Sequence, residues 1–261
     1  MRYACKDITF FIPVRLDTIC RLENLLMSIR QIIKYFDTNI LVLEAASYPN
    51  SVLPKLLGRN IKYHFIQDTD VVFHRTKYIN QAVKNMIGTS LIAIWDADVV
   101  IPASQIYAAI ESLRNKTADV AFPYDGTFLD TSFILREAFI EVGQRVSFLQ
   151  QNQEKMNTIY GPCMCGGGFL ISKEKYMYSG LENEQFYGWG CEDTERTERW
   201  RTLGFRFFRS DGALFHLSHP RGAMNSRFGS KLHRIRAEST LEESRLCSCK
   251  DIVKLNTDSY E

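Results

Sequence analysis

Residues 91–101 read Leu-Ile-Ala-Ile-Trp-Asp-Ala-Asp-Val-Val-Ile, and this stretch decides the fold class. The apolar run Leu91–Trp95 has the length and composition of a buried strand, and it leads directly into Asp96. Two carboxylates one residue apart, placed between two apolar runs, are unfavourable unless a cation neutralises them. A divalent ion does so, and a diphosphate can supply further oxygen ligands. The alternative is a turn with two solvated aspartates, but such turns rarely lie inside so apolar a segment.

On both sides of this strand, strand-like and helix-like segments alternate. Short apolar runs indicate strands, and apolar residues that recur every three or four positions indicate amphipathic helices. The predicted strands are Ile8–Val14, Ile40–Leu43, Tyr63–Ile66, Leu91–Trp95 and Val120–Phe122, and the predicted helices are 19–36, capped by Asp17, Lys77–Ile87 and 102–113, opened by Pro102. The alternation predicts an α/β fold with a Rossmann-like, mainly parallel sheet flanked by helices. Such sheets bind ligands beyond the carboxyl ends of their strands, where Asp96 and Asp98 fall.

The second half of the chain is less regular. Residues 125–160 contain one helical pattern, Phe133–Phe148, and are interpreted as an insertion or an acceptor-side element. A further helical pattern, Lys231–Arg245, precedes a polar tail. We therefore expect a single domain over residues 1–229, followed by a C-terminal helical extension and tail over residues 230–261.

Composition excludes some functions and favours a location. The net charge is only +2, from 32 basic and 30 acidic residues, so no strong field attracts nucleic acid and no such partner is expected. No apolar run approaches the roughly 20 residues of a membrane helix, and no signal peptide is recognisable. Seven cysteines in a chain without an export signal predict reduced thiols and a cytoplasmic location. Peripheral contact with the inner face of the membrane is the alternative.

A glycine-aromatic turn precedes an acidic helix start at residues 187–194, Tyr-Gly-Trp-Gly-Cys-Glu-Asp-Thr. The turn can present the Trp189 indole to a sugar ring. Glu192 and Asp193 follow in the first turn of a predicted helix that ends near Leu203. The helix dipole there favours an ionised carboxylate, as a general base requires. The alternative is a turn followed by ordinary N-terminal acids, and the segment alone does not choose between them.

Two other segments carry residues that suit a ligand site. His216 and His219 lie three residues apart, so one or both imidazoles could reach a single metal ion where the chain leaves a strand. Residues 73–80, Phe-His-Arg-Thr-Lys-Tyr-Ile-Asn, place Arg75 and Lys77 before a helix. Taken alone, these two cations are better interpreted as solvated charges.

Taken in order, these segments resemble the beta-1,4-galactosyltransferase family and its bacterial relatives, which have the GT-A fold. Pro13-Val14-Arg15 is similar to the family's Pro-Phe-Arg loop, and residues 73–80 to its Phe-Asn-Arg-Ala-Lys-Leu-Leu-Asn. Asp96-Ala97-Asp98 is similar to its Asp-Val-Asp metal motif. Residues 166–173 are similar to its Gly-Gly-Val-Ser-Ala-Leu-Ser-Lys, and residues 187–193 to its Trp-Gly-Trp-Gly-Gly-Glu-Asp. The resemblance covers most of residues 8–228 in unbroken order, and this ordered set is specific although each motif alone is modest.

The resemblance implies a donor-binding set for a UDP-sugar. Pro13 and Arg15 would border the uridine, Arg75 the nucleotide or diphosphate, and Asp96 the ribose or a metal-bound water. Trp189 would contact sugars. The complete implied set is Pro13, Arg15, Glu44, Arg75, Asp96 and Trp189.

The resemblance also implies a metal site and a catalytic pair. Asp98, His216 and His219 would ligate Mn2+ or Mg2+, because the histidines match the spacing of the family's Met-x-x-His. Glu192 would hold donor or acceptor hydroxyls, and Asp193 would be the catalytic base.

Two departures leave the donor sugar undecided. Cys191 replaces a family glycine, and Met164 stands where the family has a tyrosine beside the donor sugar. The expected function is an inverting, metal-dependent transfer of a hexose or N-acetylhexosamine, with galactose favoured. The donor is a UDP-sugar and the acceptor a saccharide or lipid-linked saccharide, in surface polysaccharide synthesis.

Two other functions were weighed against this one. A sugar-nucleotide nucleotidyltransferase would usually carry a glycine-rich phosphate loop after the first strand, whereas residues 14–17 read Val-Arg-Leu-Asp. A non-catalytic sugar-binding protein with a transferase fold would need a lost base or metal ligand, and neither is lost.

Overall fold

The computed structural model describes residues 2–49, 51–161, 164–188, 190–220, 231–247 and 251. Its larger sheet has seven strands in the spatial order β10-β6-β9-β4-β1-β2-β3. In that order they are Phe207–Arg209, Val120–Phe122, Gly168–Ser172, Leu91–Trp95, Tyr3–Val14, Phe36–Ala46 and Lys62–Gln67. Neighbours pair in parallel except at β9, which lies antiparallel between β4 and β6. The predicted mainly parallel sheet is confirmed.

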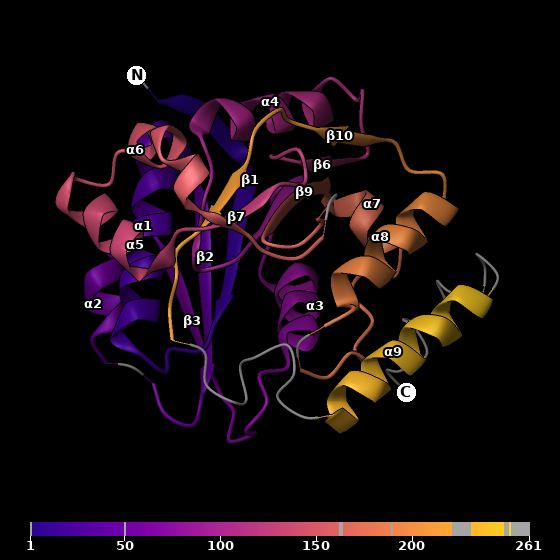
Figure 1. Ribbon diagram of the computed structural model, residues 1–261. Coiled ribbons are helices and arrows are strands. Elements are labelled where there is room, and N and C mark those ends of the chain that lie inside the picture. Colours follow the sequence, from indigo (N-terminus) through magenta and orange to yellow (C-terminus); the bar gives the residue numbers. More distant parts are fainter. Residues whose placement is uncertain are drawn as a thin grey trace.

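Helices flank this sheet (Figure 1). In the view of Figure 1, α1, α2, α5 and α6 lie on one side of β1 and β2, and α3, α7, α8 and α9 lie on the other. Their bounds are α1 Ile19–Tyr35, α2 Leu53–Leu57, α3 Arg75–Asn85, α4 Ala103–Arg114, α5 Ser132–Glu141, α6 Val146–Gln151, α7 Lys173–Tyr178, α8 Glu192–Thr202 and α9 Lys231–Leu246, with one 3₁₀ turn at Gln153–Lys155. Among the described residues, none of these helices combines the length and the apolarity that crossing a membrane requires.

The central strands follow the apolar runs in the sequence. β4 and β6 have the predicted bounds, and every residue of both strands is buried. β1 begins five residues earlier than predicted because Tyr3, Ala4 and Cys5 pair with the start of β2 although this end of the strand is largely exposed. A half-exposed strand end has no apolar run, so the sequence pattern does not mark it.

Two predictions for helices were wrong in detail. The cap of α1 is Thr18, whose hydroxyl accepts a hydrogen bond from the Arg21 amide at 3.2 Å, whereas Asp17 forms an ion pair with the Arg21 side chain at 3.1 Å. The pattern 133–148 forms two helices, α5 and α6, because the chain turns between them at Gly143, with a φ of +72°. A left-handed residue of this kind ends an α-helix.

A second, four-stranded sheet lies beside the carboxyl end of β4 and has the order β5-β11-β7-β8. Its strands are Val99–Val100, Leu214–His216, Phe128–Asp130 and Asn157–Thr158. β11 is antiparallel to β5 and parallel to β7, so His216 lies opposite both Val99 and Asp130. Helices α5 and α6 pack on this sheet around a separate hydrophobic cluster that includes Phe139, Leu149 and Phe215. The segment 125–160 thus contributes β7, which lies beside His216 and close to the Asp-Ala-Asp motif.

The C-terminal helix α9 packs along α8. Arg245 forms an ion pair with Glu198 at 2.7 Å, and Ser244 donates a hydrogen bond to Glu195. The boundary between residues 1–229 and 230–261 stays a prediction. The described cysteines, Cys5, Cys20, Cys165, Cys191 and Cys247, are free thiols, and Cys163 and Cys249 lie outside the described residues.

Candidate active site

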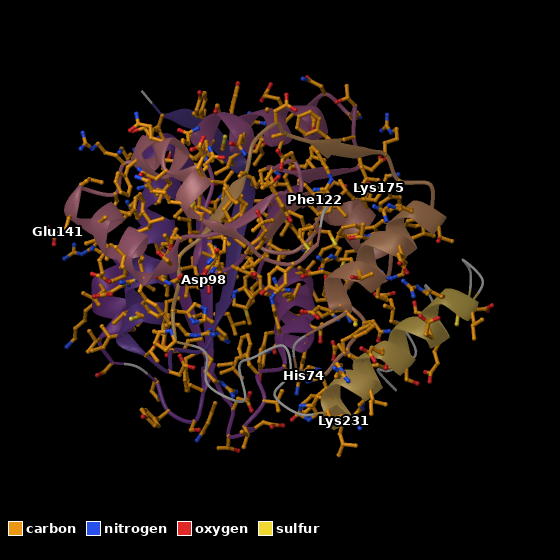
Figure 2. The ribbon with its side chains drawn as sticks, viewed as in Figure 1. His74, Asp98, Phe122, Glu141, Lys175 and Lys231 are labelled. Carbon is orange, nitrogen blue, oxygen red and sulfur yellow. The ribbon has the colours of Figure 1, made fainter. Side chains whose placement is uncertain are left out.

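The Asp-Ala-Asp turn is held by backbone hydrogen bonds to two distant segments. Asp96 donates its N–H to the carbonyl of Gly167 at 2.9 Å, and the carbonyl of Asp98 accepts the N–H of Leu217 at 2.8 Å. Asn24 of α1 donates its side-chain amide to the Leu217 carbonyl at 2.8 Å. The glycine triplet, the histidine segment and α1 therefore converge on one turn, and the side chain of Asp98, labelled in Figure 2, is 15% exposed.

Asp98, His216 and His219 each offer one ligand atom within 4.8 Å of the others. Oδ2 of Asp98 lies 3.1 Å from Nε2 of His219 and 3.6 Å from Nε2 of His216. The arrangement follows from strand register, since β5 continues directly from Asp98 and pairs with β11 at His216. All three side chains are largely buried.

The other nitrogen of His216 is also occupied. Its Nδ1 lies 2.7 Å from Oδ1 of Asp130, and the hydroxyl of Ser218 donates to the same oxygen at 2.9 Å. Although burial lowers the pKa of His216, the carboxylates of Asp98 and Asp130 raise it to about 9. Burial raises the pKa of Asp98, but the imidazoles of His216 and His219 hold it well below its ordinary value.

The chemistry of these donors fits a divalent cation. Two imidazole nitrogens and one carboxylate oxygen converge, and this mixture suits Mn2+ better than Ca2+, which prefers oxygen ligands alone. The contact between Asp130 and Nδ1 fixes the tautomer that leaves Nε2 free to bind a metal, as outer partners of metal-binding histidines commonly do.

Arg75 begins α3 and reaches the first aspartate of the turn. Its Nη2 donates to Oδ1 of Asp96 at 2.7 Å, and its buried Nη1 has no hydrogen-bond partner within the described part of the chain. Burial lowers the pKa of Arg75, but the carboxylates around it, that of Asp96 foremost, raise it above its ordinary value. Arg75 therefore remains positively charged, and its Nη1 can donate a hydrogen bond to a ligand. Lys77, on the same helix, is exposed.

Glu192 and Asp193, the acidic pair at the start of α8, line the same cavity as Arg75. Cys191 adopts a left-handed conformation, with a φ of +67°, immediately before the helix, a position that favours glycine. Oε2 of Glu192 accepts the N–H of Gly190 at 2.8 Å. Burial, and after it the carboxylate of Asp193, raise the pKa of Glu192 to about 7. Oδ1 of Asp193 accepts a hydrogen bond from Nη2 of Arg196 at 2.5 Å.

These groups line one cavity of about 310 Å³. It brings together nine of the predicted site residues: Pro13, Arg15, Arg75, Asp96, Asp98, Glu192, Asp193, His216 and His219. Met164, the residue that departs from the family tyrosine, also lies on its wall, beside Phe128 and Tyr160. The wall of the cavity thus carries arginines, the Asp98, His216 and His219 triad, and an acidic pair.

Comparisons with known proteins agree with this geometry. Residues 148–221, which include the glycine triplet, the acidic pair and both histidines, match the family described as the N-terminal domain of galactosyltransferase. Over this segment the chain resembles galactosyltransferases. Its fold is similar to that of the catalytic domain of Drosophila beta1,4-galactosyltransferase 7, solved in complex with xylobiose, at 17% sequence identity and a TM-score of 0.50. The similarity covers 80% of this chain but only 65% of the Drosophila chain. A comparison with curated protein sequences finds no match.

The resemblance and the GT-A-like fold that the motifs predict are thereby confirmed. The matched segment, 148–221, contains none of the first 147 residues, so the family match does not test the earlier motifs. β1, β2, β4 and α3 bring the Pro-Val-Arg loop and Arg75 to the Asp-Ala-Asp turn.

Two predicted donor-binding residues have contacts that the sequence did not indicate. Glu44 lies at the end of β2 with 1% exposure, accepts the hydroxyl of Tyr63 at 2.6 Å, and is not part of the cavity wall. Arg15 does border the cavity, but its guanidinium donates to the carbonyls of Ala45 and Asp70 at 2.9 and 2.7 Å. A third donation goes to Asp68 at 2.5 Å, so Arg15 holds the segment 68–71 in place. Trp189 lies outside the described residues.

Three further residues belong to the site although the sequence did not single them out. Arg21 lines the cavity one turn before Asn24 of α1. Asp130 reaches His216 through strand pairing, which no local pattern reveals. Arg196 contacts Asp193 at a spacing of three residues on α8, and this spacing of opposite charges was visible in the sequence.

Proposed function

We propose that this protein is an inverting, metal-dependent glycosyltransferase that uses a UDP-sugar as donor. The observation that carries the proposal is the cavity in which the Asp98, His216 and His219 triad faces the acidic pair at the start of α8. The galactosyltransferase-like fold and the family match over residues 148–221 support the same function.

The catalytic step is a single displacement. Asp193 accepts the proton of an acceptor hydroxyl while that oxygen attacks the anomeric carbon of the donor. The bond from the anomeric carbon to the diphosphate oxygen breaks as the new one forms, and the electron pair leaves with the nucleoside diphosphate. One carboxylate is sufficient for inversion, whereas a retaining glycosidase needs a pair flanking the bond.

Other residues bind and orient the substrates. Arg75, with its open Nη1, and Arg21 line the cavity on the side where we place the diphosphate. Glu192 binds a sugar hydroxyl in this proposal, and its burial beside Asp193 and its hydrogen bond from the Gly190 N–H support that role. A divalent cation held by Asp98, His216 and His219 would neutralise the negative charge that develops on the leaving diphosphate.

The donor sugar is a hexose or an N-acetylhexosamine, with galactose favoured. The acceptor is a saccharide or lipid-linked saccharide in surface polysaccharide synthesis, and the reaction takes place in the cytoplasm, at the inner face of the membrane when the acceptor is lipid-linked. Met164 and Cys191 are the two positions of the cavity wall at which this chain departs from the family. Since Met164 replaces the tyrosine beside the donor sugar, we assign the choice between donor sugars to Met164.

The test is a screen of common sugar nucleotides with the full chain and Mn2+, read as release of nucleoside diphosphate. The proposal predicts that UDP-galactose or another UDP-hexose is turned over and that chelation abolishes turnover. Full turnover after exhaustive chelation would remove the metal from the proposal, and no release from any sugar nucleotide would remove the transferase function.

A further inference from the structure

A buried charged network lies behind Asp193. Arg196 is completely buried, and its Nη1 donates to both carboxylate oxygens of Glu182, at 3.1 and 2.9 Å. Its Nη2 donates to Oδ1 of Asp193. One guanidinium therefore joins a fully buried carboxylate to a carboxylate that is 27% exposed at the cavity. Of these three residues, Asp193 lines the cavity, whereas Arg196 and Glu182 lie behind it.

The far end of this network is rigidly held. The hydroxyl of Tyr176 donates to Glu182, and the backbone N–H of Glu182 donates to Oδ1 of Asn80 at 2.9 Å. The guanidinium carbon of Arg196 lies 4.2 Å from the centre of the Phe169 ring, in cation–π contact. Since every partner of Arg196 on this side is buried, the arginine cannot follow a movement of Asp193.

On the cavity side, the carboxylate of Asp193 lies against the backbone of Gly166, which has no side chain. A Cβ added at Gly166 would lie 2.5 Å from Oδ2 of Asp193, closer than side-chain atoms approach one another. Gly166 is itself fixed, because its carbonyl accepts the hydroxyl of Tyr124 at 2.6 Å. The two oxygens of Asp193 therefore have different surroundings: Oδ1 is bound to Arg196, and Oδ2 rests over Gly166.

We infer that Arg196, anchored by Glu182, is a positioning residue that binds Oδ1 of Asp193 and leaves Oδ2 as the atom that accepts the acceptor's proton. The inference rests on the proposed function, because it concerns the orientation of the proposed base. Gly166 contributes to this arrangement because it has no side chain and therefore leaves room for Oδ2 of Asp193. General-base catalysis requires such fixed geometry, and a misplacement of about 1 Å can lower a rate about 10²-fold.

The chain provides a matched control in Arg199. It is as deeply buried on the same helix, forms an ion pair with Glu195 at 2.8 Å, and donates to the carbonyl of Leu181 at 2.7 Å, but among the described residues it forms no hydrogen bond or ion pair with Asp193. Loss of Arg196 or of Arg199 removes one buried cation from α8. Only the loss of Arg196 also releases the proposed base.

The experiment compares kcat and KM of folded protein for UDP-galactose with Mn2+, read as UDP release, in Arg196→Gln and Arg199→Gln. The double variant Glu182→Gln, Arg196→Gln removes both buried charges and is used if the single variant does not fold. We expect Arg196→Gln, or the double variant, to lower kcat about 10- to 100-fold with KM unchanged, as misplacement of a base would. Arg199→Gln should retain the wild-type kcat.

A second pair of variants tests the other oxygen. Gly166→Ala should lower kcat in the same way, because its methyl group occupies the place of Oδ2. Gly88→Ala is the control, since a Cβ there meets nothing within 4 Å. If Arg196→Gln and Arg199→Gln have equal kcat, or if Gly166→Ala has the wild-type kcat, the inference is wrong.

Crystal structures of wild type and Arg196→Gln separate this inference from the proposed function. If wild type releases no UDP, the function fails, and the position of Oδ2 in the two structures still decides the inference. An Asp193 side chain that keeps one conformer over Gly166 without Arg196 would overturn it, and a displaced side chain would support it.

Discussion

Replacement of Asp193 by asparagine should remove catalysis while leaving the donor site intact. Arg196 donates to Oδ1 of Asp193, so in the variant it will select the amide oxygen of the new side chain. The amide nitrogen must then occupy the place of Oδ2 over Gly166. A donor group consequently faces the acceptor hydroxyl where the wild type presents a proton acceptor.

The magnitude follows from this exchange. General-base assistance is worth about 10²- to 10⁴-fold, which corresponds to about 2.7 to 5.4 kcal/mol of activation free energy. The fold should tolerate the change, because Arg196 keeps a hydrogen bond at this position and its buried partner Glu182. We expect a loss of about 1 kcal/mol in the free energy of unfolding, the size of one weakened hydrogen bond.

The assay measures initial rates of UDP release, calorimetric titration of UDP with Mn2+, and thermal unfolding on the same preparations. The result expected is a rate lower by at least about 10²-fold with unchanged affinity for UDP and Mn2+. Asp98→Asn is the contrasting variant, since it should weaken metal-dependent UDP binding as well as the rate. A near wild-type rate in Asp193→Asn would refute its assignment as the base, and Glu192 would then be the next candidate.

Three further outcomes are expected. His219→Ala should weaken Mn2+ binding measured by calorimetry by more than the roughly 10- to 100-fold that loss of an outer partner causes, and unchanged affinity would exclude this imidazole as a ligand. Since the pKa of Glu192 is raised to about 7 in the folded protein, the folded state binds the proton more tightly, so this group makes stability fall as pH rises from about 4.5 to 7. Metal-free Glu192→Gln should therefore be more stable than wild type at pH 8, by roughly 1 to 3 kcal/mol in urea unfolding, and a less stable variant would contradict the raised pKa. Arg15→Gln should lower the free energy of unfolding by about 2 kcal/mol, because its charged hydrogen bonds hold segment 68–71, and wild-type stability would show that these bonds contribute nothing.

The sequence by itself determined the elements that depend on local pattern. Buried strands such as Leu91–Trp95 and Val120–Phe122 are continuous apolar runs, so their bounds were predicted without error. Asp98, His216, His219 and the acidic pair were singled out from motifs and their order along the chain, which the sequence alone contains, and the fold brings them to one cavity. The helix break at Gly143 was missed because the apolar periodicity continues across it and only the backbone conformation reverses.

Only the tertiary structure decided which atoms meet. His216 lies beside Asp98 because β5 pairs with β11, and Asp130 reaches the same imidazole because β7 pairs with β11 from the other side. Arg15, predicted to border the nucleotide, donates its N–H groups to backbone carbonyls and to Asp68. The partners of a long polar side chain are set by segments distant in sequence, whereas a strand or a helix is set by its own residues. For this reason the sequence could name nine of the residues of the cavity, and the fold alone could assign their contacts.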